Sequence, residues 1–387
     1  MSDTVSAEQS DASTAPGSLR EVAAVFLKLG TIAFGGPAAH IALMRQEVVE
    51  RRQWVTEQRF LDLLGASNLI PGPTSTELAI YLGYARAGRR GLLLAGTLFI
   101  LPAMLIVLAF AWAYRRYGAT ANAQWVLYGI KPVIIAIILV ALVGLIRTAV
   151  TDVPTALVGV AVAVLLVLGV NPLVLLVGAG LIIVLVRQRG VLTRLRPTLL
   201  VPAPLVLGSS HSLLTLFLTF LKIGAVVWGS GYVLLAFLRT DFVQHLHWLT
   251  DRQLVDAVAV GQLTPGPVFT TATFIGYLVA GVPGALLATL AIFLPSFLFV
   301  ALLYPLVPRI RRSAVASAAL DGVNVAALGL IAGVAWELGR AALVDAFTVV
   351  LSVAALGILL RYRANSAWLI GAGAILGLAY HLLAVAL

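Results

Sequence analysis

Two Pro-Gly-Pro runs carry the residues best placed to do chemistry, one in Asn68–Thr74 and one in Gln262–Pro267. The prolines cannot donate backbone hydrogen bonds or continue a helix, so each run ends one helix and precedes another. Apolar residues flank both runs, which places the breaks at membrane depth, where irregular backbone must be buried in protein or line a watery cavity. The helix that follows offers free N–H groups and a partial positive charge, as a tetrahedral dianion requires. A packing kink is the alternative.

A second pair of breaks is expected at Gly35–Pro37 and Gly229–Gly231. Lys28 and Lys222 each stand seven residues before the first glycine of these breaks. A cation inside an apolar segment is costly and is a functional candidate for that reason. The alternatives are that the glycines serve helix packing and that the lysines extend to the membrane interface.

Three acids are candidates for coupling transport to an ion. Glu77 stands with Thr74 in a Thr-x-x-Glu pattern, which predicts either a capping box or a carboxylate that is protonated beside an anion. Asp62 and Asp256 are duplicated, and either pair with arginines or lie at the surface. The second half has Thr271 at the position of Glu77, so any role of Glu77 is asymmetric.

Other polar residues have both a binding and a structural interpretation. Asn68 and Gln262 either donate to an oxyanion or cap backbone, and His40, which has no partner in the repeat, is either a ligand or structural. Arg45 and Arg239 either attract anions at the mouth of a site or anchor an interfacial helix.

The composition indicates a polytopic membrane protein. Of its 387 residues, 61% are hydrophobic and 11% are charged, against about a quarter in soluble domains. The net charge of +10 arises from arginines between apolar runs, as in cytoplasmic loops, so nucleic acid is not expected as a partner. There is no cysteine, which excludes disulfides and thiolate metal sites. No cofactor or metal is expected.

An internal duplication divides the chain. At a constant offset of 194, residues 26–76 align without a gap to residues 220–270, and sixteen of the fifty-one positions are identical. One residue is then lost, and further matches follow at an offset of 193. The expected organisation is a disordered tail (1–18), a first repeat (19–190), a linker (191–212) and a second repeat (213–387).

Helical elements follow from the apolar pattern. Phe26 to Met44 fits either a kinked span or a re-entrant hairpin, and Thr56-Glu57 has the form of a helix start. Apolar runs follow at about 92–114, 125–146, 154–168 and 172–186. The loop at 86–91 holds three arginines and its counterpart at 279–284 holds none, so the charge bias alternates in opposite senses. This favours inverted repeats with about ten net crossings.

The duplicated Phe-Leu-Lys-x-Gly, the Phe-Gly-Gly-Pro with His40, the Pro-Gly-Pro runs and the region from Phe269 to Tyr277 resemble the signatures of the chromate ion transporter family in its long, two-domain form. The similarity covers nearly the whole chain after about residue 20. It implies a multi-pass carrier of the bacterial inner membrane that expels chromate and confers chromate resistance. Sulfate is the obvious competitor, the bilayer is the medium, and a homodimer is left open.

Rival functions fit less well. A membrane-embedded enzyme would need paired aspartates or a histidine–glutamate cluster, which are not present. A channel and a carrier of sulfate or another oxyanion stay open, although paired breaks favour alternating access. The coupling candidates are Asp62, Glu77 and Asp256. The expected substrate-binding residues are Lys28, Gly35, Gly36, Pro37, His40, Asn68, Pro71, Gly72, Pro73, Thr74, Lys222, Gly229, Ser230, Gly231, Gln262, Pro265, Gly266 and Pro267.

Overall fold

A computed structural model describes residues 18–34, 36–118, 120–187, 212–228, 231–304, 314–362 and 365–386, which form helices and short connections. The first half contains α1 (Leu19–Ile32), α2 (Gly36–Arg45), the π-helical turn η1 (Gln46–Arg51), α3 (Glu57–Ser67), α4 (Thr74–Tyr117), α5 (Ala121–Ala149), α6 (Val153–Val167) and α7 (Pro172–Arg187). The second half contains α8 (Leu213–Val226), α9 (Leu234–Leu238), the π-helical turn η2 (Arg239–His245), α10 (Asp251–Leu263), the 3₁₀ turn η3 (Val268–Thr270), α11 (Thr271–Leu303), α13 (Ala314–Ala342), α14 (Ala346–Tyr362) and α15 (Ser366–Ala386). The predicted all-helical class is confirmed. The tail and most of the linker lie outside the described residues.

The predicted helix start at Thr56 is present in both halves. The Thr56 side chain accepts a hydrogen bond from the Arg59 backbone N–H at the start of α3. Thr250 does the same for Gln253 at the start of α10, 194 residues later. A capping hydroxyl satisfies one of the free N–H groups of a first helical turn. The local sequence therefore sets where both helices begin.

The segment from α1 to η1 is a re-entrant hairpin, which decides between the two predicted alternatives. Lys28 of α1 forms an ion pair of 2.9 Å with Glu47 of η1. Nearer the start of the hairpin, Arg52 pairs with Glu21 at 3.4 Å. The returning arm therefore runs antiparallel to α1 and comes back to the face at which α1 begins.

A second hairpin contains the Pro-Gly-Pro run. Helix α4 changes direction at Ala87 and Gly88, where the backbone is non-helical and Gly88 has a φ of +59°. Just before this turn, Arg86 donates to Glu21 at 3.0 Å and lies over the ring of Trp54, which precedes α3. The start of α3 and the end of the first α4 segment are thus together. The Pro-Gly-Pro run forms the far end of this hairpin.

The second half repeats both hairpins from the opposite face. Lys222 pairs with Asp241 at 2.6 Å, and α11 turns at Gly281 with a φ of +64°. From residue 282 to residue 303, α11 adds 22 residues, or about 33 Å at 1.5 Å per residue. At its end, Tyr304 accepts a hydrogen bond of 2.6 Å from Arg59 of α3. We name the side with Glu21 and Tyr304 the first-half face and the side with Gly281 the second-half face.

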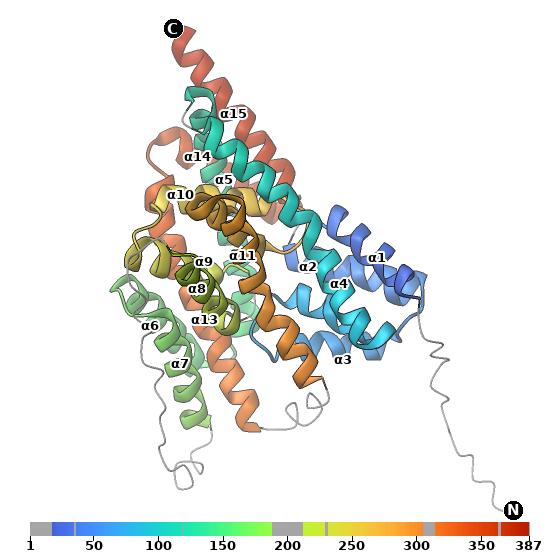
Figure 1. Cartoon of the computed structure of the whole chain (residues 1–387). Helices are drawn as coiled ribbons and strands as arrows, with labels where there is room; N and C mark the ends of the chain where they lie inside the picture. The colour runs from blue at the N-terminus through green and yellow to red at the C-terminus, as the bar shows by residue number, and fades with distance from the viewer. Residues whose placement is uncertain are drawn as a thin grey trace, which may run out of the picture.

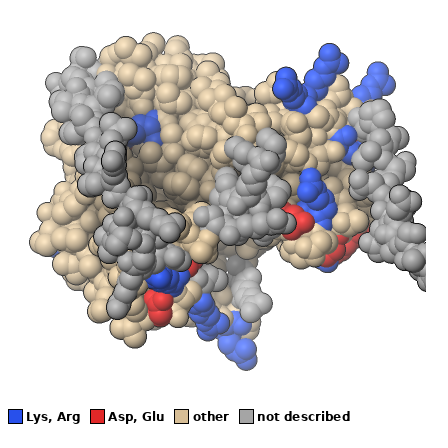
Figure 2. Space-filling model, turned by 90° about the horizontal axis from the view of Figure 1, so that it is seen from below, with Lys and Arg blue, Asp and Glu red and all other residues tan. Residues whose placement is uncertain are grey.

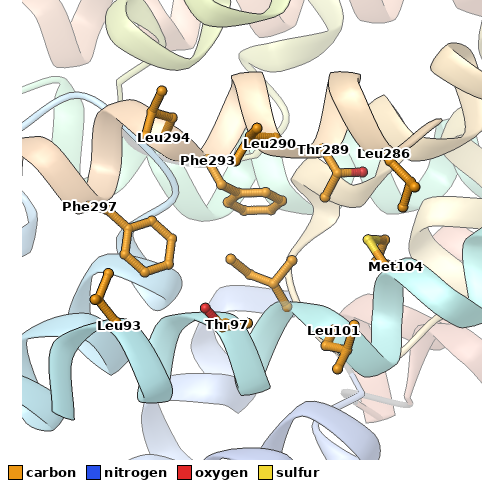
Figure 3. Close-up of a pocket in the computed structure, with 11 residues that line it drawn as sticks. Leu93, Thr97, Leu101, Met104, Leu286, Thr289, Leu290, Phe293, Leu294 and Phe297 are labelled. Carbon is orange, nitrogen blue, oxygen red and sulfur yellow. The ribbon is translucent and has the colours of Figure 1, made fainter. Parts of the chain in front are cut away.

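The arrangement in space agrees with these contacts. Figure 1 shows α1, α2, α3 and α4 on the right, α8 and α9 on the left, and α11 between the two groups. Equivalent helices α4 and α11 run antiparallel. Figure 3 shows Leu93 opposite Phe297 at one end of their contact and Met104 beside Leu286 at the other. The repeats are therefore inverted, as predicted.

Long apolar helices place the chain in a membrane. The described residues include five helical spans long and apolar enough to cross a bilayer, and α6, α7, α8 and α14 are shorter apolar helices. Large apolar side chains point outward, including Val153 at 72% exposure and Trp368 at 81%. Such surfaces are stable in lipid but not in water. Figure 2 views the molecule from below and shows more lysine and arginine than acidic side chains on that face. The number of net crossings stays a prediction.

The outer helices of each half pack against helices of the other half. Helix α5 packs against α14 and α15, while α13 packs against α6 and α7. Small residues make these contacts close, because a side chain on Gly129 would overlap the backbone at Gly373, and one on Gly322 would overlap the backbone at Ala179. Small residues are what permit helices to approach closely in lipid, where burial of apolar surface gives little drive. The halves are therefore interlocked around the hairpins.

Two equivalent corners of the scaffold, at the starts of α6 and α14, are held together by different side-chain contacts. Arg187, at the end of α7, bonds to Asp152 and Asp321. At the equivalent corner, reached by an offset of 193, Tyr128 donates to Asp345. One corner is thus ionic and the other depends on a tyrosine hydroxyl.

Candidate functional site

The ends of the hairpins, which we call the tips, meet through two reciprocal backbone hydrogen bonds. Within the described residues, the tips are 33, 34, 36 and 68–73 of the first half, and 227, 228, 231 and 262–267 of the second. The Gly72 N–H donates to the carbonyl of Val227 at 2.7 Å, and the Gly266 N–H donates to the carbonyl of Ala33 at 3.0 Å. Each bond joins the Pro-Gly-Pro tip of one half to the first tip of the other. The four tips therefore form one central assembly.

Local sequence explains why these groups pair. In Pro-Gly-Pro, glycine has the only backbone N–H. Ala33 and Val227 are the C-cap residues of α1 and α8, where helices leave carbonyls without an intrahelical donor. In a dry interior an unpaired group of either kind costs several kcal/mol, of order ~2–7. In each of the two bonds, the glycine N–H of one half therefore pairs with the C-cap carbonyl of the other half.

The tip glycines occupy positions that exclude a side chain. Gly72 has a φ of +139° and Gly266 a φ of +90°. A side chain on Gly72 would overlap the Glu77 carboxylate and meet Ser296 Oγ at 2.5 Å, and one on Gly266 would meet the methyl group of Ala103 at 2.9 Å. Glycine is therefore needed at both tips for conformation and for space.

His40 of α2 is hydrogen-bonded both to the end of α1 and to the start of α4. It is buried, with Nδ1 at 3.1 Å from Ser75 Oγ and Nε2 at 3.0 Å from the Ala33 carbonyl. A carbonyl can only accept, so Nε2 carries the proton and donates it. The Ala33 carbonyl thus accepts from both His40 and Gly266. The second half has Leu234 at this position, so this fastening is present on one side alone.

Glu77 lies beside Gly72 at the first Pro-Gly-Pro tip and is fully buried. Its Oε1 accepts a hydrogen bond from Ser296 Oγ of α11 at 3.4 Å. The predicted capping box is wrong, because Pro73 occupies the N-cap position and Thr74 is already the first helical residue. Proline itself supplies the extended backbone that precedes the helix. The carboxyl group is therefore directed to the other half and not to its own helix start.

The two tip amides differ in their surroundings. Asn68 is exposed at the C-cap of α3. Gln262 is buried beside Tyr232. The duplicated amide position thus has a buried polar side chain in the second half alone.

The remaining predicted tip residues surround the breaks. Pro71, Pro73, Thr74, Pro265 and Pro267 flank the tip glycines, Gly36 and Pro37 begin α2, and Gly231 packs on Val268. Gly35, Gly229 and Ser230 lie outside the described residues.

The candidate lysines are paired with buried acids. The side chains of Lys28 and Lys222 are 44% and 41% exposed, whereas those of Glu47 and Asp241 are 7% and 8% exposed. Sequence reasoning did not select these acids, although they occupy equivalent positions at the offset of 194. The pairs join the two arms of each first hairpin. A role of the lysines in anion binding stays a prediction.

The duplicated arginines also have duplicated acids. Arg45 pairs with Glu57 at 2.8 Å, and Arg239 pairs with Asp251 at 2.8 Å. Both acids stand in the first turn of the helix that follows, α3 or α10. A carboxylate is favoured there by the positive end of the helix. These pairs connect the first hairpin of each half to the second.

Asp256 forms a buried cluster with residues of the first half. Its side chain is 1% exposed, lies 3.2 Å from Lys131 Nζ of α5 and accepts from the Tyr114 hydroxyl at 2.9 Å. The predicted pairing of Asp256 with an arginine or a surface position is wrong, because Lys131 reaches it within the core. Lys131 has Asn324 as its equivalent, which concealed it from repeat-based reasoning. Asp62, the equivalent of Asp256, is half-buried on α3.

Two apolar cavities lie between pairs of helices. One of about 330 Å³ lies between α4 and α11, and one of about 300 Å³ lies between α6 and α13. Figure 3 shows leucine and phenylalanine side chains facing each other across the first, with Thr97 and Thr289 among them. Neither is lined by a predicted site residue. These linings suit hydrocarbon and not a dianion.

Comparison with known proteins gives a consistent result. A family described as "Chromate transporter" matches residues 20–184 and 214–378, one copy in each half. The chain is 38% identical to a chromate transport protein of Cupriavidus metallidurans over 94% of this chain and 93% of that one. It is 36% identical to a probable chromate transport protein of Synechococcus elongatus, covering 88% and 89%. It is 30% identical to a chromate transport protein of Pseudomonas aeruginosa, covering 90% and 88%. No solved structure matches the chain.

Proposed function

The chain belongs to the chromate transporter family, and from this premise we propose that it is a secondary carrier that exports chromate across the bacterial inner membrane. Export would keep the oxyanion out of the cytoplasm and so confer chromate resistance. The inverted hairpins are the element that a carrier of this kind needs, because paired broken helices at the midplane are typical of alternating access.

The observation that carries the proposal is the reciprocal bonding of the tips. The bonds from Gly72 to Val227 and from Gly266 to Ala33 are equivalent, and each joins hairpins that enter from opposite faces. Opening one bond while the other stays closed would expose the centre to one face at a time. A single central site with two equivalent closures is what alternating access requires.

Chromate would bind among the helix starts at the tips. Helix α4 begins at Thr74 and η3 begins at Val268, directly after the two Pro-Gly-Pro runs. Helix N-termini present N–H donors and partial positive charge to an anion. This site would recognise a tetrahedral dianion by shape and charge, which sulfate shares.

Arginine placement supports an orientation in which the first-half face is cytoplasmic. Arg86 lies at that face beside Glu21, and Arg89 and Arg90 follow in the same turn. The equivalent turn of α11, on the second-half face, has no lysine or arginine. Cytoplasmic loops carry such an excess of basic residues. A reporter fusion at Arg89 would test this, and a periplasmic signal there would contradict it.

Flux of labelled chromate into inverted membrane vesicles tests the transport function. We expect accumulation above that of vesicles without the protein, competition by excess sulfate, and dependence on the electrical or proton gradient. Accumulation that merely equilibrates in either direction would indicate a channel. No accumulation above the control would contradict transport of chromate.

Two substitutions test the site. We expect Pro265→Ala and Lys222→Ala to lower chromate tolerance of cells to that of cells without the protein, while amounts in the membrane stay unchanged. Pro265→Ala adds a donor and backbone freedom at the tip, and Lys222→Ala leaves Asp241 buried without its cation. The matched control is Pro154→Ala, at the first turn of α6 and away from the tips. Normal tolerance in both site variants would make the tips structural only.

A further inference from the structure

The first segment of α4 contains polar atoms that the rest of the protein leaves unsatisfied. Thr76 Oγ1, Glu77 Oε2 and the Tyr81 hydroxyl are buried and have no hydrogen-bond partner among the described residues. The three side chains have no exposed surface. Buried polar groups are nearly always hydrogen-bonded, so a group without a protein partner indicates that a ligand, a water molecule or a proton has a role there.

No cation is placed to balance the Glu77 carboxylate within the described part of the chain. Ser296 of α11 is its hydrogen-bond partner. The charged or titratable groups on the elements packed around this segment are engaged elsewhere or lie on the outer part of α3. They are Lys28 of α1 with Glu47, His40 of α2 with Ser75 and Ala33, Arg59 of α3 with Tyr304, and Asp62 of α3. On the same helices, Glu21, Arg45 and Glu57 are in ion pairs, and Arg20 is exposed at the start of α1. An ionised carboxylate here would be an uncompensated charge at membrane depth, which is strongly unfavourable.

A bound dianion would raise the electrostatic cost of an ionised Glu77 carboxylate further. Glu77 touches Gly72, the residue at the centre of the proposed anion site. Two like charges in a dry environment repel strongly, by about 4 kcal/mol even at 4 Å and an effective dielectric constant of 20. A hard metal cation is a poor remedy, because such ions take six or more oxygens and Glu77 has one hydroxyl neighbour. A proton removes the charge without further ligands.

We propose that Glu77 is the proton-binding residue of the carrier, that it takes up one proton when the anion binds, and that this proton arrives from the first-half face along Tyr81 and Tyr304. The proton adds to the carboxylate to give the carboxylic acid, and when the anion is released it returns to the first-half face by the same route. This inference rests on the proposed function, since it concerns the same site.

The residues of this route form a line from the surface to the tip. Arg59 is exposed at the start of α3 and donates to the Tyr304 hydroxyl at 2.6 Å. The rings of Tyr304 and Tyr81 have their centres 5.9 Å apart. Tyr81 stands one helical turn after Glu77, and side chains of a helix lean toward its N-terminus, so the ring lies on the Glu77 side. Hydroxyl groups, with water where the gaps exceed hydrogen-bond length, can pass a proton along this line.

The second half has no such line. Glu77 is replaced by Thr271, Ser296 by Ala103, Arg59 by Gln253 and Tyr304 by Ala111 at the equivalent positions. Every ionisable or tyrosine member of the route is thus confined to the first-half face. Proton access to the tip is therefore one-sided, although the backbone assembly around it is symmetric.

The equilibrium test is the pH dependence of chromate binding to the purified full-length protein in detergent. If one proton binds with each anion, the dissociation constant rises by up to tenfold per pH unit once Glu77 ionises. In Glu77→Gln, which is isosteric and always neutral, this dependence should be lost. Titration of chromate itself affects both proteins equally, so the difference between them isolates Glu77.

The same samples allow proton uptake to be counted with an indicator dye in weak buffer. We expect about one proton more per bound chromate in the natural protein than in Glu77→Gln. Equal uptake and equal pH dependence would overturn the proposal. So would binding that requires sodium and ignores pH. If the natural protein binds no chromate at all, the proposed function fails, which is a separate result.

The route is tested by kinetics. After a drop in pH, Tyr81→Phe should take up the proton at least tenfold more slowly, while its equilibrium chromate affinity stays unchanged. The matched control, Tyr277→Phe, removes a hydroxyl from the corresponding segment of α11, where no route is proposed, and should behave as the natural protein does. An unchanged rate in Tyr81→Phe would overturn the route. If Glu77→Gln does not fold, this comparison still decides the inference.

Discussion

The pair formed by Lys131 and Asp256 allows a quantitative test of how dry the core of the carrier is. Their side chains are 10% and 1% exposed, and the charged atoms are 3.2 Å apart. At this distance and an effective dielectric constant of 20, the attraction is about 5 kcal/mol. Removing one partner of such a pair leaves a buried charge and typically costs ~3–5 kcal/mol, whereas replacing both is near neutral.

We therefore expect Lys131→Met and Asp256→Asn each to lower the free energy of unfolding by about 3 kcal/mol, and the double variant to lower it by far less than the sum. Unfolding would be followed by denaturant titration in lipid–detergent micelles, and the four proteins would form a double-mutant cycle. The expected coupling free energy is ~2–4 kcal/mol.

The chain offers a matched control for this cycle. Arg45 and Glu50 are 2.5 Å apart, but their side chains are 44% and 50% exposed. Exposed pairs of this kind contribute about 0.2–1 kcal/mol, even at good distances. A coupling free energy for Lys131 and Asp256 that is no larger than for the exposed pair would refute the reasoning, because water would then reach the cluster and screen both charges.

Two further predictions concern single positions. Gly72→Ala should abolish transport, because the alanine side chain would displace a carboxyl group and the residue would have to adopt a φ of +139°. Gly281→Ala has open space around it but requires a φ of +64° with a ψ of −151°, a combination that glycine alone adopts readily, so this variant should retain transport and lose ~1–3 kcal/mol of stability. Flux in proteoliposomes and thermal unfolding distinguish the two. The Thr155 backbone N–H and the Arg187 guanidinium hold the pKa of Asp152 at about 2, below its usual 3.8. Because the pKa is depressed in the folded state, this stabilisation is present above about pH 4 and is lost as the pH falls toward 2. The melting temperature of Arg187→Met should thus lie below that of the natural protein at pH 6 and approach it below pH 4.

Features set by local chemistry could be predicted from the sequence. Proline and glycine fixed the positions of the breaks, and Thr56 marked a helix start that the structure confirms. The repeat offset and the uneven arginines indicated inverted halves, which the antiparallel contact of α4 and α11 bears out. These signals work because backbone donors, φ angles and charge placement act within a few residues or on the membrane as a whole.

Contacts between halves could not be predicted in the same way. Nothing local identifies the Val227 carbonyl as the acceptor for Gly72, since either C-cap residue leaves free carbonyls. Lys131, the partner of Asp256, has Asn324 at the equivalent position, so the duplication does not identify it. The capping pattern at Thr74 was misleading because Pro73 took the N-cap position. In each case a tertiary contact or a neighbouring proline overrode the pattern of the segment.

Symmetric and asymmetric features of the two halves have different consequences for transport. The tip bonds and the ion pairs of Lys28 and Lys222 are duplicated, so exchanging the roles of the halves leaves their free energy unchanged. A carrier with these contacts alone would favour neither the inward-open nor the outward-open state. Glu77, His40 and Lys131, the partner of Asp256, are instead replaced by Thr271, Leu234 and Asn324 in the other half. Because a ligand shifts an equilibrium only by its differential affinity for two states, the direction of transport must be sought in these unmatched groups and not in the duplicated frame.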